Sequence, residues 1–177
     1  MTNEYAVAAG SGEPAVGKPR TFETIVYGGL AIGVLDFLDA SIFFPLYYGI
    51  SFVDVWHGPA SGMIGRESSR GGGWNTAILG IFLHFVVAFC IAAVYFLLSR
   101  FLPFLVRRPI VSGLIYGVVA HFVMQFVVIP FSAIATWPPW PPIGALLNSI
   151  IGHALLAGLP VALIASWSAR RNSVDFP

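Results

Sequence analysis

Four titratable side chains lie along an otherwise apolar chain, each near the middle of a long hydrophobic segment. They are Asp36, His84, His121 and His153. Titratable groups are costly in hydrocarbon and usually face the interior of a helix bundle or a water-filled cavity. Imidazole changes its charge near physiological pH and is also the commonest metal ligand, and a carboxylate can partner it in either role. The four residues therefore predict one polar cluster inside a membrane.

Three further polar residues on the same segments are expected to join this intramembrane polar cluster. Asp39 follows Asp36 at a spacing that puts the two on overlapping faces of a helix. Gln125 comes four residues after His121, and Asn148 lies on the segment that carries His153. For Asp39 a second interpretation stays open, in which its carboxylate reaches the outer lipid headgroups instead.

Three interpretations of the cluster stay open at this point. The first is a structural network, in which Asp36 accepts a hydrogen bond from a histidine and the polar contacts fix how the helices pack. The second is metal or haem binding by the histidines and a carboxylate, although each ligand would come from a different helix. The third is a path for protons or small ions. The identity of any metal stays unknown, and the first and third interpretations call for no cofactor.

The elements that position these residues are predicted to be four transmembrane helices. The chain has 177 residues, of which 57% are hydrophobic and only 10% charged, whereas soluble domains carry about 25% charged residues. Apolar segments at 24–48, 74–98, 110–131 and 143–167 are each long enough to cross roughly 30 Å of hydrocarbon. The expected fold is therefore all-α, a four-helix bundle within the lipid bilayer.

Small residues recur along these segments at intervals of three or four, which places them on one face of a helix. Such faces allow neighbouring helices to approach closely in a membrane. The residues expected to pack between helices are Gly29, Gly33, Ala77, Gly80, Ala88, Gly113, Gly117 and Gly152. His84 lies on the small face of its segment, so it should point towards protein and not towards lipid.

The connector between the first two spans has an unusual composition. We expect a short helix that lies in the membrane interface and is broken at Gly58-Pro59, with a re-entrant loop as the alternative. Residues 1–20 are predicted to be a disordered cytoplasmic tail and residues 172–177 a second cytoplasmic tail. Residues 21–171 then form a single domain.

The distribution of basic residues predicts the orientation. Seven of the nine lie in the N-terminal tail, the second loop and the C-terminal tail, and two lie in the connector, which places both termini in the cytoplasm. The seven are Lys18, Arg20, Arg100, Arg107, Arg108, Arg170 and Arg171, and the two are Arg66 and Arg70.

Composition and motifs exclude several functions. A net charge of +1 offers nothing that would attract nucleic acid, and the single cysteine, Cys90, cannot form an internal disulfide. The chain has no Gly-rich phosphate loop, nucleophile elbow or HExxH motif. We therefore expect a non-enzymatic membrane protein, either a small channel or carrier subunit or a structural subunit. Its partners would be lipid and further copies of itself or another membrane protein. The alternative is a metal- or haem-binding membrane protein that uses the mid-membrane histidines.

Several short motifs are distinctive as a set. They are ASGMIG at 60–65, Gly71-Gly72, Leu83-His84-Phe85, Pro103-Phe104-Leu105, Tyr116-Gly117, IPFSA at 129–133, and His153 with Gly158-Leu159-Pro160. Together they resemble a family of small bacterial inner-membrane proteins, some of them described as YagU-like. The resemblance covers residues 28–165 and implies four helices and an inner-membrane location, but no reaction. At His121 the chain departs from the family pattern, in which an aromatic residue, often tyrosine, is usual.

Overall fold

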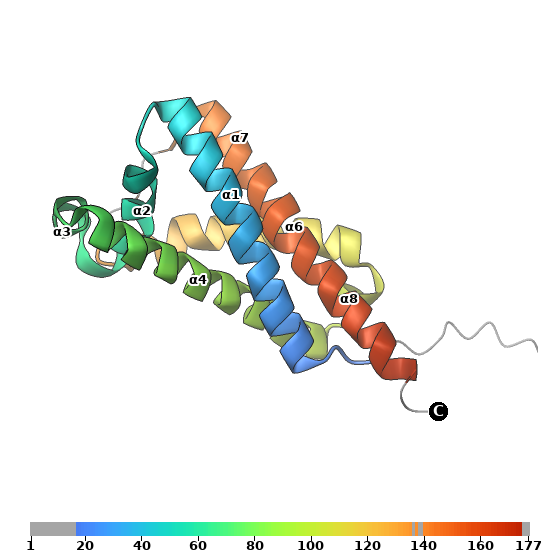
Figure 1. Cartoon of the computed structure of the whole chain (residues 1–177). Coiled ribbons are helices and arrows are strands. Elements are labelled where there is room, and N and C mark those ends of the chain that lie inside the picture. Colours follow the sequence, from blue (N-terminus) through green and yellow to red (C-terminus); the bar gives the residue numbers. More distant parts are fainter. Residues whose placement is uncertain (1–16, 136, 138–139, 175–177) are drawn as a thin grey trace, which may run out of the picture.

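The computed structural model describes residues 17–135, 137 and 140–174, so most of the expected N-terminal tail and residues 175–177 lie outside the described residues. Every regular element in that part of the chain is helical (Figure 1), and η marks a π-helical turn, which is wider than an α-helical one. The last helix continues to Val174, beyond the expected boundary at 171. In chain order the elements are η1 (Glu23–Tyr27), α1 (Gly28–Tyr48), α2 (Phe52–Ile64), α3 (Arg66–Gly71), α4 (Gly73–Phe101), α5 (Phe104–Arg107), α6 (Pro109–Val123), η2 (Met124–Val128), α7 (Ile143–Gly152), η3 (His153–Gly158) and α8 (Leu159–Val174).

Four helices among the described residues are long and apolar enough to cross a membrane. They are Glu23–Tyr48, Gly73–Phe101, Pro109–Val128 and Ile143–Arg171. This confirms the predicted all-α fold with four candidate membrane spans. Many large apolar side chains stay on the surface of the isolated chain, which is the surface expected of helices that contact lipid.

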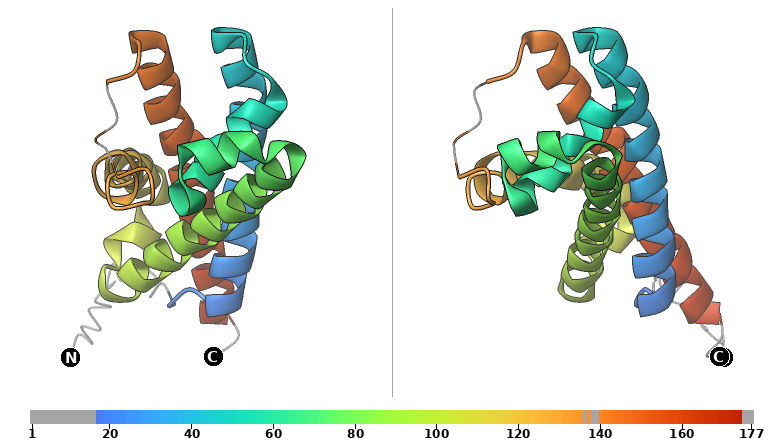
Figure 2. Two further views of the ribbon diagram at one scale, coloured as in Figure 1. Left: turned by 90° about the vertical axis from the view of Figure 1, so that its left-hand side faces the viewer. Right: turned by 60° about the vertical axis from the view of Figure 1, so that its left-hand side comes forward.

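Two helices form the centre of the molecule. The η1–α1 helix and the α7–η3–α8 helix lie side by side, α4 packs on α1, and α6 packs on η3 and α8 (Figures 1 and 2). The start of the first helix lies beside the end of the last helix. The Arg20 backbone N–H donates to the Ser168 hydroxyl at 2.6 Å and links the two segments. The first and last spans therefore have their chain ends on the same side of the protein.

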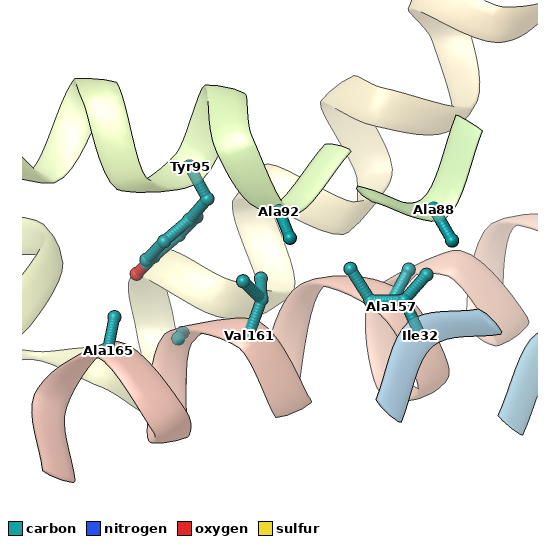
Figure 3. Close-up of a cluster of buried hydrophobic side chains, with 8 residues drawn as sticks. Ile32, Ala88, Ala92, Tyr95, Ala157, Val161 and Ala165 are labelled. Atoms are coloured by element: carbon teal, nitrogen blue, oxygen red, sulfur yellow. The ribbon is translucent and has the colours of Figure 1, made fainter. Parts of the chain in front are cut away.

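The core where α1, α4 and the last span meet is built mostly from small side chains. Ala92, Val161 and Ala165 are completely buried there, and Tyr95 of α4 fills the space beside them (Figure 3). The Tyr95 hydroxyl donates to the Leu105 carbonyl at 2.9 Å. Small residues let the helix backbones approach, so dispersion contacts and hydrogen bonds hold helices together where lipid leaves no hydrophobic driving force between them.

The expected packing residues on α6 lie at a close contact between helix backbones. Gly113 and Gly117 face the backbone of η3 and the start of α8, at positions where a side chain at either residue would collide with main-chain atoms. Gly158 of η3 completes this contact from the other side, and the sequence analysis did not assign it to packing.

The other expected packing residues differ in what surrounds them. On α1, phenylalanine rings of α4 cover two glycines, Phe89 over Gly29 and Phe85 over Gly33. On α4, Ala77, Gly80 and Ala88 are buried. Gly152 is buried too, but a side chain there would meet the Asp39 carboxylate at an ordinary contact distance of 3.5 Å.

The connector differs from the expected broken interfacial helix. α2 runs unbroken through Gly58 and Pro59 and begins with a capping box between Ser51 and Asp54. The expected break at Gly58-Pro59 is therefore wrong. Proline removes one backbone hydrogen bond, but the buried Trp56 and Ala60 anchor α2 on both sides of that position.

α2 also folds back along the spans instead of lying beyond their ends (Figure 2). The Trp56 ring stacks on the Phe37 ring in the middle of α1, with 4.6 Å between centroids and 18° between planes. The same indole meets His84 of α4 edge to face, with centroids 5.1 Å apart. This is the arrangement expected of the re-entrant alternative.

Candidate functional site

His84 of α4 and Asp36 of α1 face each other where the two helices cross. The His84 Nδ1 atom lies 3.8 Å from Asp36 Oδ2, and the His84 Nε2 atom lies 3.0 Å from the Gly33 carbonyl oxygen. A carbonyl can only accept, so we assign the proton to Nε2, which donates to Gly33. The Phe85 ring, next to His84 on α4, fills the space that a side chain at Gly33 would take, so α4 lies close against the α1 backbone here.

With Nε2 committed to the Gly33 carbonyl, Nδ1 is the His84 nitrogen that faces Asp36. In the neutral ring Nδ1 carries a lone pair that points towards an acceptor-only carboxylate, which is unfavourable. A single proton between Nδ1 and Asp36 Oδ2 turns the repulsion into attraction, either as imidazolium with carboxylate or as neutral imidazole with carboxylic acid. The two titratable groups therefore face each other at 3.8 Å, just beyond the distance of a direct hydrogen bond.

A cavity of about 60 Å³ adjoins the pair and reaches a third titratable group, His153 of η3. A space of this size is large enough to hold water. The polar part of its wall is Asp36, His84 and His153, and the remaining wall is Ile32, Val87, Ala88, Ile91, Met124 and Ala157. Three of the four predicted mid-span residues thus share one cavity.

His153 and His121 form the next part of the polar cluster, around Ser149. The His153 Nδ1–H donates to the Ser149 carbonyl at 2.9 Å, and His121 Nδ1 lies 3.0 Å from the Ser149 hydroxyl. The two imidazoles are in contact, with centroids 5.3 Å apart. His121 is buried, and its Nε2 has no hydrogen-bond partner among the described residues. The structure therefore joins the fourth mid-span residue to the other three through His153.

Asp39 takes part in a hydrogen bond between helices. The Asn148 Nδ2 amide of α7 donates to Asp39 Oδ2 at 2.9 Å, one turn from Asp36. Beside it lies a wide groove of about 400 Å³ whose apolar wall is Ile42, Phe43, Leu46 and Tyr47. Asp39 and Asn148 therefore extend the polar cluster towards the far ends of α1 and α7.

Gln125 is the predicted member that the structure does not bring into the cluster. It is half-buried, and its side chain makes no hydrogen bond within the described part of the chain. The reason is the π-helical η2 turn, which begins at Met124 and ends the four-residue repeat that had aligned Gln125 with His121. Met124 lines the cavity instead.

Sequence reasoning missed His57, which is buried in α2. Its Nε2–H donates to the Gly73 carbonyl at 3.0 Å, and its Nδ1 lies 3.8 Å from Asp54 Oδ1. The arrangement repeats that of His84, with one nitrogen on a glycine carbonyl and the other facing an aspartate. The available signal was the three-residue spacing of Asp54 and His57 on one helix.

The geometry does not fit a metal centre. No three His, Cys, Asp or Glu side chains within the described residues come close enough to hold a metal ion. Both ring nitrogens of His84 and the Nδ1 atoms of His121 and His153 are also directed at backbone carbonyls, a serine or an aspartate. A metal ion held by three such side chains would need different side-chain positions.

No family model, curated protein sequence or solved structure matches this chain. The resemblance to small bacterial inner-membrane proteins therefore stays a prediction, and the site is interpreted from its own geometry.

Proposed function

We propose that the protein is a non-enzymatic integral membrane protein, a small carrier or channel subunit that moves protons through the Asp36–His84 pair. The observation that carries the proposal is that the two ring nitrogens of His84 face different groups. Its Nε2–H is committed to the Gly33 carbonyl, and its Nδ1 faces Asp36 at a cavity wall. Asp/His chains are a common form of proton relay in membrane proteins.

The charges around the cavity favour a pair that exchanges one proton. The titratable groups that face His84 are Asp36 from α1 and His153 from η3, whereas α2 contributes the uncharged Trp56 and η2 the uncharged Met124. With one proton on the pair, the carboxylate charge is balanced and the site as a whole is neutral. A site that is neutral in one state and singly charged in the next costs less in a low-dielectric interior than one that accumulates charge.

The transfer then needs only short movements. A proton held between Asp36 Oδ2 and His84 Nδ1 crosses the cavity through water to His153, and the His153–His121 contact takes it towards α6. Trp56 covers one side of the His84 ring, so the proton leaves His84 through the cavity.

The membrane placement is part of the same proposal. With both termini in the cytoplasm of a bacterial inner membrane, α2 enters from the outer side as a re-entrant helix and returns through α3. Four helices enclose only a narrow pathway, and the other copies in a homo-oligomer would add helices around it. The excess of basic residues at the shared chain ends of the first and last spans supports this orientation.

Proton flux into liposomes tests the function directly. The purified protein is reconstituted with a pH-sensitive dye inside the vesicles, and a potassium diffusion potential drives protons inwards. Wild-type protein should give flux above that of empty liposomes, and Asp36→Asn should abolish it. His57→Gln is the matched control, because His57 has the same kind of partners away from the cavity. Flux no greater than in empty liposomes, or equal flux in Asp36→Asn, would overturn the proposal in favour of a structural subunit.

A further inference from the structure

A basic pocket lies at the end of α4, remote from the polar cluster. It has a volume of about 150 Å³ and lies between the last turn of α4, α5 and residues 17–19. Three cationic side chains line it, Lys18, Arg100 and Arg107, and none of the described lining residues is acidic. The other lining residues are Gly17, Pro19, Ser99, Pro103 and Val106. Arg20 and Arg171 do not line this pocket and lie against the Glu23 carboxylate at 3.5 and 3.8 Å.

The surroundings of this basic pocket are apolar and exposed. Phe101 is 80% exposed, and Leu102 and Phe104 are each about half exposed. The Arg100 guanidinium lies over the Phe96 ring, 5.8 Å from its centroid. The cationic side chains of the pocket therefore lie at the edge of an exposed apolar surface, at the end of α4.

We propose that this basic pocket binds the phosphate of an anionic phospholipid, whose acyl chains then lie along Phe101, Leu102 and Phe104. Guanidinium groups match the geometry of phosphate oxygens and can hold two of them at once. Basic pockets at the ends of transmembrane helices have the charge and position that anionic headgroups require. Arg100 and Arg107, with no acidic residue among the described lining residues, favour a headgroup of net negative charge over a zwitterionic one.

Lipid retention in mild detergent tests the site. The wild-type protein is mixed with phosphatidylglycerol or phosphatidylcholine, and bound lipid is counted by native mass spectrometry. Phosphatidylglycerol should be retained and phosphatidylcholine should not. Each basic residue near an anionic surface contributes roughly fivefold in affinity at low salt, so Arg107→Gln should weaken retention about fivefold and Arg100→Gln/Arg107→Gln about 30-fold.

The neighbouring arginine provides the matched control. Arg108 is exposed in the same loop but does not line the pocket, so Arg108→Gln should change retention much less than Arg107→Gln, and Arg107→Lys should restore most of it. Equal losses in Arg107→Gln and Arg108→Gln would overturn the site in favour of general attraction to anionic lipid. Displacement of the lipid by millimolar inorganic phosphate would overturn the choice of a lipid and leave a free-phosphate site.

Discussion

The Trp56 carbonyl oxygen of α2 lies directly against Gly80 of α4, in the space that a side chain at residue 80 would fill. This contact holds the returning helix against the spans and places the Trp56 ring over His84. Gly80 therefore lets α2 approach α4 closely enough for the Trp56 ring to contact His84 at the proposed proton site.

Gly80→Ala should destabilise the protein. The new methyl group would collide with main-chain atoms that cannot move without shifting α2, and such overpacking costs about 1–3 kcal/mol. Thermal unfolding in detergent measures it. Gly62→Ala in α2 is the control, because a side chain there meets only Ser132, at an ordinary contact distance of 3.7 Å, and alanine should stabilise a helix interior by about 0.5–1 kcal/mol. Equal effects of the two changes would show that α2 does not pack on α4 in this way.

The cap of α2 should give the protein a stability that depends on acid pH. The Ser51 hydroxyl and backbone N–H donate to Asp54 at 2.6 and 3.2 Å, and these bonds hold the pKa of Asp54 below its usual value of 3.8. A lowered pKa means that the stabilisation is complete above the usual value and is lost as the pH falls through the lowered one.

The measurement compares wild type with Asp54→Asn in thermal unfolding across that range. Wild type should be the more stable protein at neutral pH, and the difference should shrink once the pH falls below about 4. Ser51→Ala should lose the same pH dependence, because it removes the hydroxyl donor. A difference between wild type and Asp54→Asn that is unchanged in acid would mean that the cap does not form.

The proposed orientation predicts the behaviour of reporter fusions. Seven basic residues lie on the side of the termini and two on the other, so an alkaline phosphatase fused after the last residue should be inactive in the cytoplasm. The same enzyme fused after Ile134, between the third and fourth spans, should be active. The reverse pattern would contradict the orientation but not the four-helix fold.

The positions of the spans could be predicted from the sequence because length and apolar composition alone decide them. The predicted starts at residues 24, 74, 110 and 143 agree within one residue with the helices that the structure contains. The pairing of Asp36 with His84 was predictable for a related reason. Both lie at mid-span, and titratable groups at that depth must find one another or water.

Two features depended on local geometry that periodicity does not reveal. Gln125 was placed by extending a four-residue repeat through Met124, where the helix changes to a π turn and its face rotates. α2 was expected to break at Pro59, but burial of Trp56 and Ala60 outweighs one lost backbone hydrogen bond. In both cases tertiary packing decided the outcome, and a single sequence carries little information about such packing.

The last prediction concerns the energetic coupling of Asp36 and His84. Asp36→Ala leaves His84 with its bond to the Gly33 carbonyl but removes the carboxylate from Nδ1. His84→Ala leaves the Asp36 carboxylate without the imidazole 3.8 Å away, and it also removes the side-chain donor to the Gly33 carbonyl. A stranded ionised group is the more expensive of the two. His84→Ala should therefore destabilise the protein more than Asp36→Ala does.

The double variant should cost less than the sum of the two single changes, because the second change removes the group that the first one stranded. Residues in contact show coupling free energies of about 0.5–3 kcal/mol in such cycles. Asn148→Ala combined with His84→Ala is the control. Asn148 donates to Asp39 and not to the pair, so those two changes should add within about 0.5 kcal/mol. Strict additivity of Asp36→Ala and His84→Ala would mean that no proton is shared between Oδ2 and Nδ1, and the proton-transfer proposal would lose its central pair.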